Sequence, residues 1–92
     1  GATPLTSAQA APGGTVTIPL TEGRKMAFSL PEGITGDGVT SSVPNVAVGR
    51  LSDDRKWIII EAVKKQPTAS TSDITIGLKD KNGAMKFVVT VN

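Results

Sequence analysis

The sequence predicts an all-β fold, either a sandwich or a barrel, and three observations carry that prediction. Apolar and polar residues alternate over residues 74–79 and 85–91, on both sides of Asn82-Gly83, which is the strongest short-range signal of a β-hairpin. Turn signals recur about every 8–12 residues, which is typical of sandwiches and barrels. No stretch has the apolar period of an amphipathic helix.

The register of this hairpin depends on which side chains must share a face. A two-residue Asn82-Gly83 loop pairs Leu78 with Phe87, and a four-residue loop also keeps the apolar side chains together. A three-residue loop separates them, so we reject it. We therefore expect a tight turn with Gly83 at positive φ. The side chains expected to be buried are Ile76, Phe87 and Val89.

The N-terminal third of the chain contains two clear strands. Residues 1–12 are poor in bulky side chains and form either a linker or a short edge strand. Residues 15–20 alternate as a strand in which Pro19, lacking an N–H donor, belongs at a sheet edge or near the strand end. Residues 26–30 form the next strand, and residues 31–38, rich in Gly, form a flexible connection.

The middle of the chain contributes further strands. Residues 46–49 are a short strand, and residues 56–63 are a continuous, β-branched run, too short and too branched for a helix. We interpret this run as a strand covered on both faces. Residues 64–72 form a polar connection to the hairpin. The chain thus divides into an N-terminal edge strand or linker, residues 1–12, and a β-sandwich or barrel, residues 13–92.

Composition excludes several kinds of function. The 92 residues suffice for one core, and they include no cysteine and no histidine. A thiolate nucleophile, the usual general base and the commonest transition-metal ligand are therefore missing. The net charge of +2 comes from dispersed residues, whereas nucleic-acid binding needs clustered positive charge. No apolar run approaches the ~20 residues of a membrane span, so we expect neither nucleic-acid binding nor membrane insertion.

Loop carboxylates are the remaining candidates for catalysis or metal binding. Asp53 and Asp54 are adjacent in a predicted turn, where they would not converge on one substrate. The other aspartates in predicted loops or strand ends are Asp37, Asp73 and Asp80. They follow no Asp-x-Asp-x-Asp pattern of a calcium loop. We expect no catalytic residue, no metal site and no cofactor, and hence no enzyme.

Trp57 is the most informative single residue for a binding function. Alternation places Trp57 and Ile59 on one face of their strand and Ile58 and Ile60 on the other. Because both faces are apolar, we expect Trp57 to be a core residue. The alternative is an exposed aromatic platform on which a sugar stacks.

Basic side chains flank the same strand. Arg55 and Lys56 precede Trp57, and Lys64 and Lys65 follow the strand. They are candidate contacts for an anionic surface such as a phosphate-rich glycan. The more ordinary interpretation, which we favour, is that charges at strand ends protect the sheet from edge-to-edge aggregation.

Three segments carry a resemblance to a known family, in the same order as in that family. They are Gly-Gly-Thr-Val-Thr-Ile at residues 13–18, Ser-Ser-Val-Pro-Asn-Val-Ala-Val at residues 41–48, and the hairpin from residue 73 to residue 91. Together they resemble the bacterial immunoglobulin-like domains of group 2. In that family these segments are the second strand, a serine-serine segment followed by Pro-x-Val-Ala, and the closing pair of strands.

The resemblance implies both a fold and a role. The fold would be an immunoglobulin-like antiparallel β-sandwich of about seven strands. The role would be that of a non-catalytic structural or adhesive module in a bacterial surface protein, as in intimin- and invasin-like adhesins, or in a phage capsid or tail protein. Such a module acts outside the cell, at the cell surface or in the virion. Its partners would be other domains of a larger chain and a cell-surface glycan or receptor protein. The rival hypothesis is a carbohydrate-binding module that uses an exposed Trp57.

Overall fold

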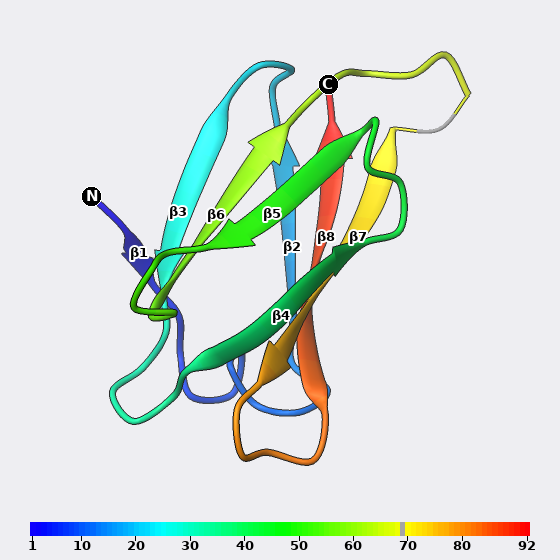
Figure 1. Cartoon of the computed structure of the whole chain (residues 1–92). Coiled ribbons are helices and arrows are strands. Elements are labelled where there is room, and N and C mark those ends of the chain that lie inside the picture. The colour runs from blue at the N-terminus through cyan, green and yellow to red at the C-terminus, as the bar shows by residue number, and fades with distance from the viewer. Residues whose placement is uncertain (69) are drawn as a thin grey trace.

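Eight strands and no helix make up the part of the chain described by the computed structural model, which is every residue except Ala69 (Figure 1). The strands are β1 (Thr3–Pro4), β2 (Thr15–Leu20), β3 (Lys25–Ser29), β4 (Gly36–Ser41), β5 (Ala47–Leu51), β6 (Trp57–Ala62), β7 (Thr71–Leu78) and β8 (Ala84–Val91). They form two four-stranded sheets, in the orders β1-β3-β6-β5 and β2-β8-β7-β4. The predicted all-β sandwich is confirmed.

The strand count and the strand directions differ from the prediction. There are eight strands rather than about seven. The sandwich is also not wholly antiparallel, because β1 runs parallel to β3 and β2 runs parallel to β8. Both exceptions arise from the N-terminal segment: it adds one strand to the edge of the first sheet, then crosses over and adds another to the edge of the second.

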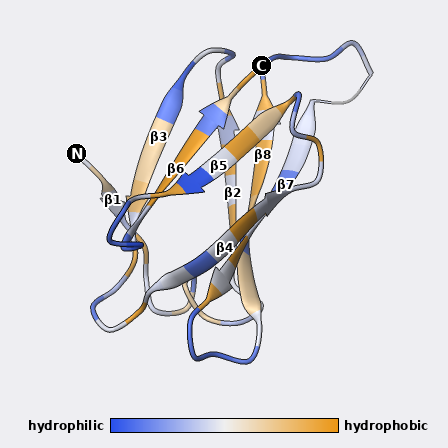
Figure 2. Ribbon diagram, viewed as in Figure 1, coloured by the Kyte–Doolittle hydropathy of each residue, from blue (hydrophilic) through white to orange (hydrophobic). Residues whose placement is uncertain are grey.

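The hydrophobic core lies between the inner faces of the two sheets. At its centre the rings of Phe28 and Phe87 lie 4.9 Å apart, in a tilted arrangement that aromatic pairs favour. The predicted burial of Ile76, Phe87 and Val89 is confirmed, because all three side chains are inaccessible to solvent. Figure 2 shows hydrophobic residues recurring along β5, β6 and β8, and hydrophilic residues in the loops at both ends of the sandwich.

The edge position predicted for Pro19 is confirmed. Strand β2 is the outermost strand of its sheet and pairs only with β8. The N–H of Lys86 donates to the Gly14 carbonyl, and that of Asn92 donates to the Leu20 carbonyl, so the even-numbered residues of β2 bond to β8. By alternation Pro19 turns its nitrogen away from β8, where a missing donor costs no ladder hydrogen bond.

The register of the β7–β8 hairpin corrects the prediction. Gly77 pairs with Ala84 and Ile74 pairs with Phe87, so residues 78–83 stay unpaired between β7 and β8, a longer stretch than either of the two loops allowed. The shift is by an even number of residues, so the apolar side chains still share the inner face. Gly83 has the predicted positive φ, 141°, but not in a tight two-residue turn. A Cβ on Gly83 would lie 2.8 Å from the Cβ of Pro12, so contact with the N-terminal loop is a second reason for glycine there.

Two predicted connections also end differently. The expected flexible connection over residues 31–38 is partly strand, because β4 begins at Gly36 and contains a bulge between Gly36 and Val39. The predicted polar connection over residues 64–72 is shorter than expected, since β7 begins at Thr71. It includes Ala69, which lies outside the described residues.

A small hydroxyl network joins the two sheets where their edge strands β5 and β4 meet. Ser72 is completely buried, and its Oγ accepts a hydrogen bond from the Val43 N–H at 3.0 Å. The Ser41 and Ser72 hydroxyls lie 2.8 Å apart, and Ser41 Oγ donates to the Ala47 carbonyl. The serine-serine segment therefore has a structural role: it satisfies polar groups that the sandwich buries.

Candidate binding face

The sheet β1-β3-β6-β5 has an outward surface that no other described part of the chain covers, and we call it the β6 outer face. Strand β6 alternates between buried and accessible residues, with Ile58, Ile60 and Ala62 turned into the core. The register of the neighbouring strands places their outward side chains beside those of β6. The β6 outer face comprises Pro4, Lys25, Ala27, Ser29, Val48, Arg50, Trp57, Ile59 and Glu61.

Trp57 is the largest side chain on this face, and its predicted burial is wrong. The residue is 44% exposed, and Ser29 lies opposite it on β3. A small residue in that position leaves the indole ring uncovered on one side. The prediction of a strand covered on both faces fails for the same reason. Ile59 is only half-buried, since no second layer packs on this side of β6.

A stiff turn holds Trp57 in place. The Ser52 N–H donates to the Trp57 carbonyl, and the Trp57 N–H donates to Ser52 Oγ, both at 3.0 Å. Ser52 Oγ donates to Asp54 at 2.7 Å, and the Lys56 N–H donates to the same carboxylate oxygen. These two donors, the Ser52 hydroxyl first, lower the pKa of Asp54 below its usual value of 3.8. Side-chain hydrogen bonds from Ser52 and Asp54 therefore hold the turn before Trp57 together.

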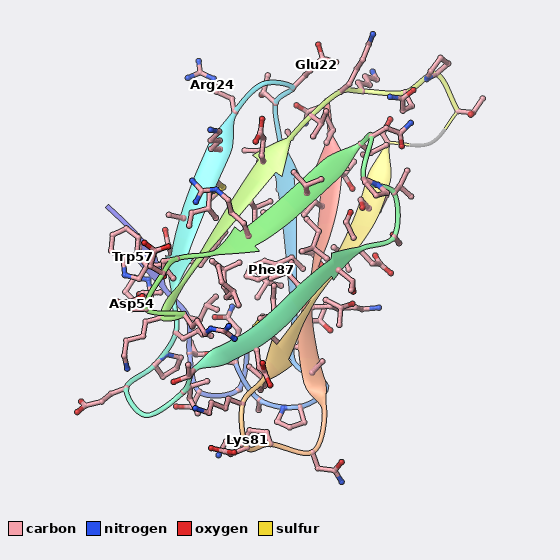
Figure 3. All side chains as sticks on the ribbon, viewed as in Figure 1. Glu22, Arg24, Asp54, Trp57, Lys81 and Phe87 are labelled. Carbon is pink, nitrogen blue, oxygen red and sulfur yellow. The ribbon has the colours of Figure 1, made fainter. Side chains whose placement is uncertain are left out.

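The four basic residues proposed from the sequence do not converge. Arg55 lies in the turn before Trp57, where it forms an ion pair with Asp37 at 3.3 Å. Lys64 and Lys65 lie beyond the other end of β6, where the Lys65 N–H donates to Glu22 Oε1. Figure 3 places Trp57 and Asp54 at one end of the sheet and Glu22 and Arg24 at the opposite end. A single small ligand cannot touch both basic pairs.

Arg50 is a cation on the β6 outer face, on the strand beside β6, that the sequence reasoning missed. It pairs with Ile59 in the register of β5 and β6, and its side chain is exposed. Among the described residues, the ion pairs are Arg55–Asp37 and Lys86–Asp73, so Arg50 belongs to none of them. We expected the strand to end at Gly49, and continuing the alternation of Val48 by one step would have placed Arg50 on the same face.

An open cleft of about 480 Å³ lies between the start of β4 and the turn that precedes Trp57. It is lined by Asp37, Gly38, Leu51, Ser52, Asp53 and Arg55. The Arg55–Asp37 ion pair lies in this cleft and neutralises one of its carboxylates. In the described part of the chain, no three acidic, cysteine or histidine side chains come together as metal ligands would.

Comparisons with known proteins leave the family of this chain open. Neither the protein-family models nor the curated proteins include a match to it. None of the described residues belongs to a helix of the length and apolarity that a membrane crossing needs.

Proposed function

We propose that this chain is a non-catalytic adhesive module with an immunoglobulin-like fold, and that the β6 outer face is its contact surface. It would belong to a bacterial surface protein or a phage virion protein, outside the cell or in the particle, joined to further domains. The observation that carries the proposal is the 44% exposure of Trp57, the sole tryptophan, on a sheet face with half-buried Ile59 beside it. Exposed aromatic and aliphatic side chains grouped together mark interaction sites.

The strand order supports the immunoglobulin-like part of the proposal. Immunoglobulin domains place their first, second, fifth and fourth strands in one sheet and their third, sixth and seventh strands in the other. If β2 is the part of the first strand that has crossed to the second sheet, β1-β3-β6-β5 and β4-β7-β8 follow that order. The segments at residues 13–18 and 41–48, which suggested the family, lie at the start of β2 and around the buried serine network.

The composition supports a role without catalysis. Without histidine and cysteine, acid–base and nucleophilic chemistry would fall to carboxylates, lysines and hydroxyls. Asp53 and Asp54 are both exposed, and Asp54 is held by hydrogen bonds that favour its ionised form. A catalytic acid needs the opposite shift, towards a higher pKa.

Within adhesive roles, the surroundings of Trp57 favour a glycan over a purely mechanical spacer. A sheet presents a flat surface, and the faces of an exposed indole ring attract the weakly positive C–H groups of a sugar. Ser29 and Ser52, both with small side chains, neighbour Trp57 on the adjacent strand and in the turn. A spacer has no need of an exposed tryptophan on a central strand.

Affinity electrophoresis in gels that contain neutral or acidic polysaccharides tests the proposal. We expect at least one polysaccharide to retard the protein, and Trp57→Ala to abolish the retardation while the protein stays folded. Val88→Ala, on the outward side of β8 in the other sheet, is the matched control and should migrate like the parent. If no polysaccharide retards the parent, or if both variants lose binding equally, the β6 outer face is not a glycan-binding surface.

A further inference from the structure

We infer that the β6 outer face selects sugars that carry a carboxylate, with the ring on Trp57 and the carboxylate on Arg50. This inference rests on the proposed glycan-binding function and names the chemical class of its ligand. Two independent features carry it: the charge balance of the face and the placement of Arg50, which belongs to neither ion pair of the described residues, beside the exposed indole ring of Trp57.

The β6 outer face carries a net positive charge. Its two cations are Lys25 and Arg50, and its only anion is Glu61. Lys25 lies directly opposite Glu61 in the register of β3 and β6, so these two charges offset each other. Arg50 remains, exposed and outside both ion pairs of the described residues. An anionic group on the ligand is therefore the complement of this face.

The placement of Arg50 suits a ligand of sugar size. Arg50 pairs with Ile59, and Trp57 lies two residues from Ile59 along the same side of β6. Such diagonal neighbours on a sheet lie roughly 7–8 Å apart, within reach of aromatic and long side chains. A ring stacked on the indole thus directs a substituent towards the guanidinium. The planar guanidinium bonds a carboxylate with two parallel N–H donors, so a carboxylate suits it better than a neutral hydroxyl.

Trp57 also provides the readout, because it is the only tryptophan in the chain. Its fluorescence is titrated with polygalacturonate, with fully methyl-esterified polygalacturonate, and with hyaluronate and polysialic acid as a second uronate and a sialate. We expect a saturable change with at least one carboxylated polymer. Esterification, which removes the charge and keeps the ring, should weaken the apparent affinity about tenfold or more, because the ester loses the ionic attraction and the pair of parallel hydrogen bonds that a carboxylate makes with the guanidinium.

Two charge-matched variants separate recognition from general attraction. Arg50→Gln should bind the acid and its ester equally, whereas Arg24→Gln, in the exposed turn before β3, should discriminate between them as the parent does. Equal loss in both variants would mean that only overall charge matters, and the inference would fail. If the acid and the ester bind the parent equally and Trp57→Ala abolishes retardation in the gels, the inference fails but the proposed function stands.

Two further outcomes would overturn the inference. One is that none of the carboxylated polymers changes the fluorescence of Trp57. The other is a change in fluorescence with protein concentration alone, accompanied by larger particles in light scattering that Trp57→Ala does not form. That result would make the β6 outer face a protein–protein contact.

Discussion

The two outward faces of the sandwich have the same architecture but opposite chemistry. The β6 outer face is centred on Trp57 and Ile59, with an unpaired Arg50 beside them. The outward face of the sheet β2-β8-β7-β4 carries one aliphatic β-branched side chain on β8, Val88, among many threonines. Those threonines are Thr15, Thr17, Thr40, Thr71, Thr75 and Thr90. On the threonine face, the charges of Lys86 and Asp73 are paired at 3.6 Å.

This difference separates what folding requires from what function requires. Threonine favours strands and leaves a hydroxyl for water, so the threonine face is well suited to solvent. Its neutral ion pair and lack of aromatic rings offer little to a ligand. Threonines in place of Trp57 and Ile59 would cost the β6 outer face little stability, since neither side chain is fully buried. Folding alone therefore explains little of its aromatic and aliphatic residues, whereas the proposed contact with a ligand would account for them.

The largest expected effect tests the assignment of inner and outer faces. Phe87 and Val88 are neighbours on β8 that point to opposite sides of the sheet. Phe87→Ala should lower the free energy of unfolding by about 3–5 kcal/mol, because it leaves a cavity beside Phe28. Val88→Thr should change it by no more than about 0.5 kcal/mol. Chemical denaturation measures both, and comparable losses would contradict the assignment of the two faces.

The alternation of inward and outward side chains along a strand explains why the sequence could predict the core. Ile76, Phe87 and Val89 were placed in the core correctly, because the side-chain period of a strand holds whichever residues are paired across the hairpin. The predicted loop length was wrong, and the observed loop brings Gly83 close to Pro12, which is far from it in the sequence. Such a contact leaves no local pattern.

The candidate site was harder to predict than the core, for two physical reasons. A run of isoleucines shows that a strand is apolar, but not whether a second layer covers it, so Trp57 was placed in the core. The sequence pattern also predicts that the strand over residues 46–49 ends at Gly49. Gly49 is instead a position of close packing, where a Cβ would lie 2.7 Å from Cγ2 of Ile74. Strand β5 therefore continues, and Arg50 reaches the β6 outer face.

A smaller effect is expected when the β6 outer face is made to resemble the threonine face. Trp57→Thr and Ile59→Thr should each lower the free energy of unfolding by about 1 kcal/mol or less, since neither side chain is fully buried. The double variant should bind less of a hydrophobic dye than the parent does, while Thr75→Ile on the threonine face should bind more. A loss as large as that of Phe87→Ala would mean that the β6 outer face is covered in solution, and the comparison of the two faces would fail.

The smallest effect concerns the charges on the two faces. Asp73→Asn removes the partner of Lys86, and both side chains of that pair are 45% exposed. Exposed ion pairs contribute only about 0.2–1 kcal/mol, so the variant should lose no more than that at low salt. The loss should disappear in about 1 M salt, where the screening length is near 3 Å.

Arg50→Gln removes a cation that belongs to no ion pair among the described residues, so its free energy of unfolding should match that of the parent at both salt concentrations. Urea denaturation at the two salt concentrations measures these differences. A salt-dependent loss in Arg50→Gln would reveal an anionic partner for Arg50 within the chain, and the guanidinium would then not be free to hold the carboxylate of a ligand.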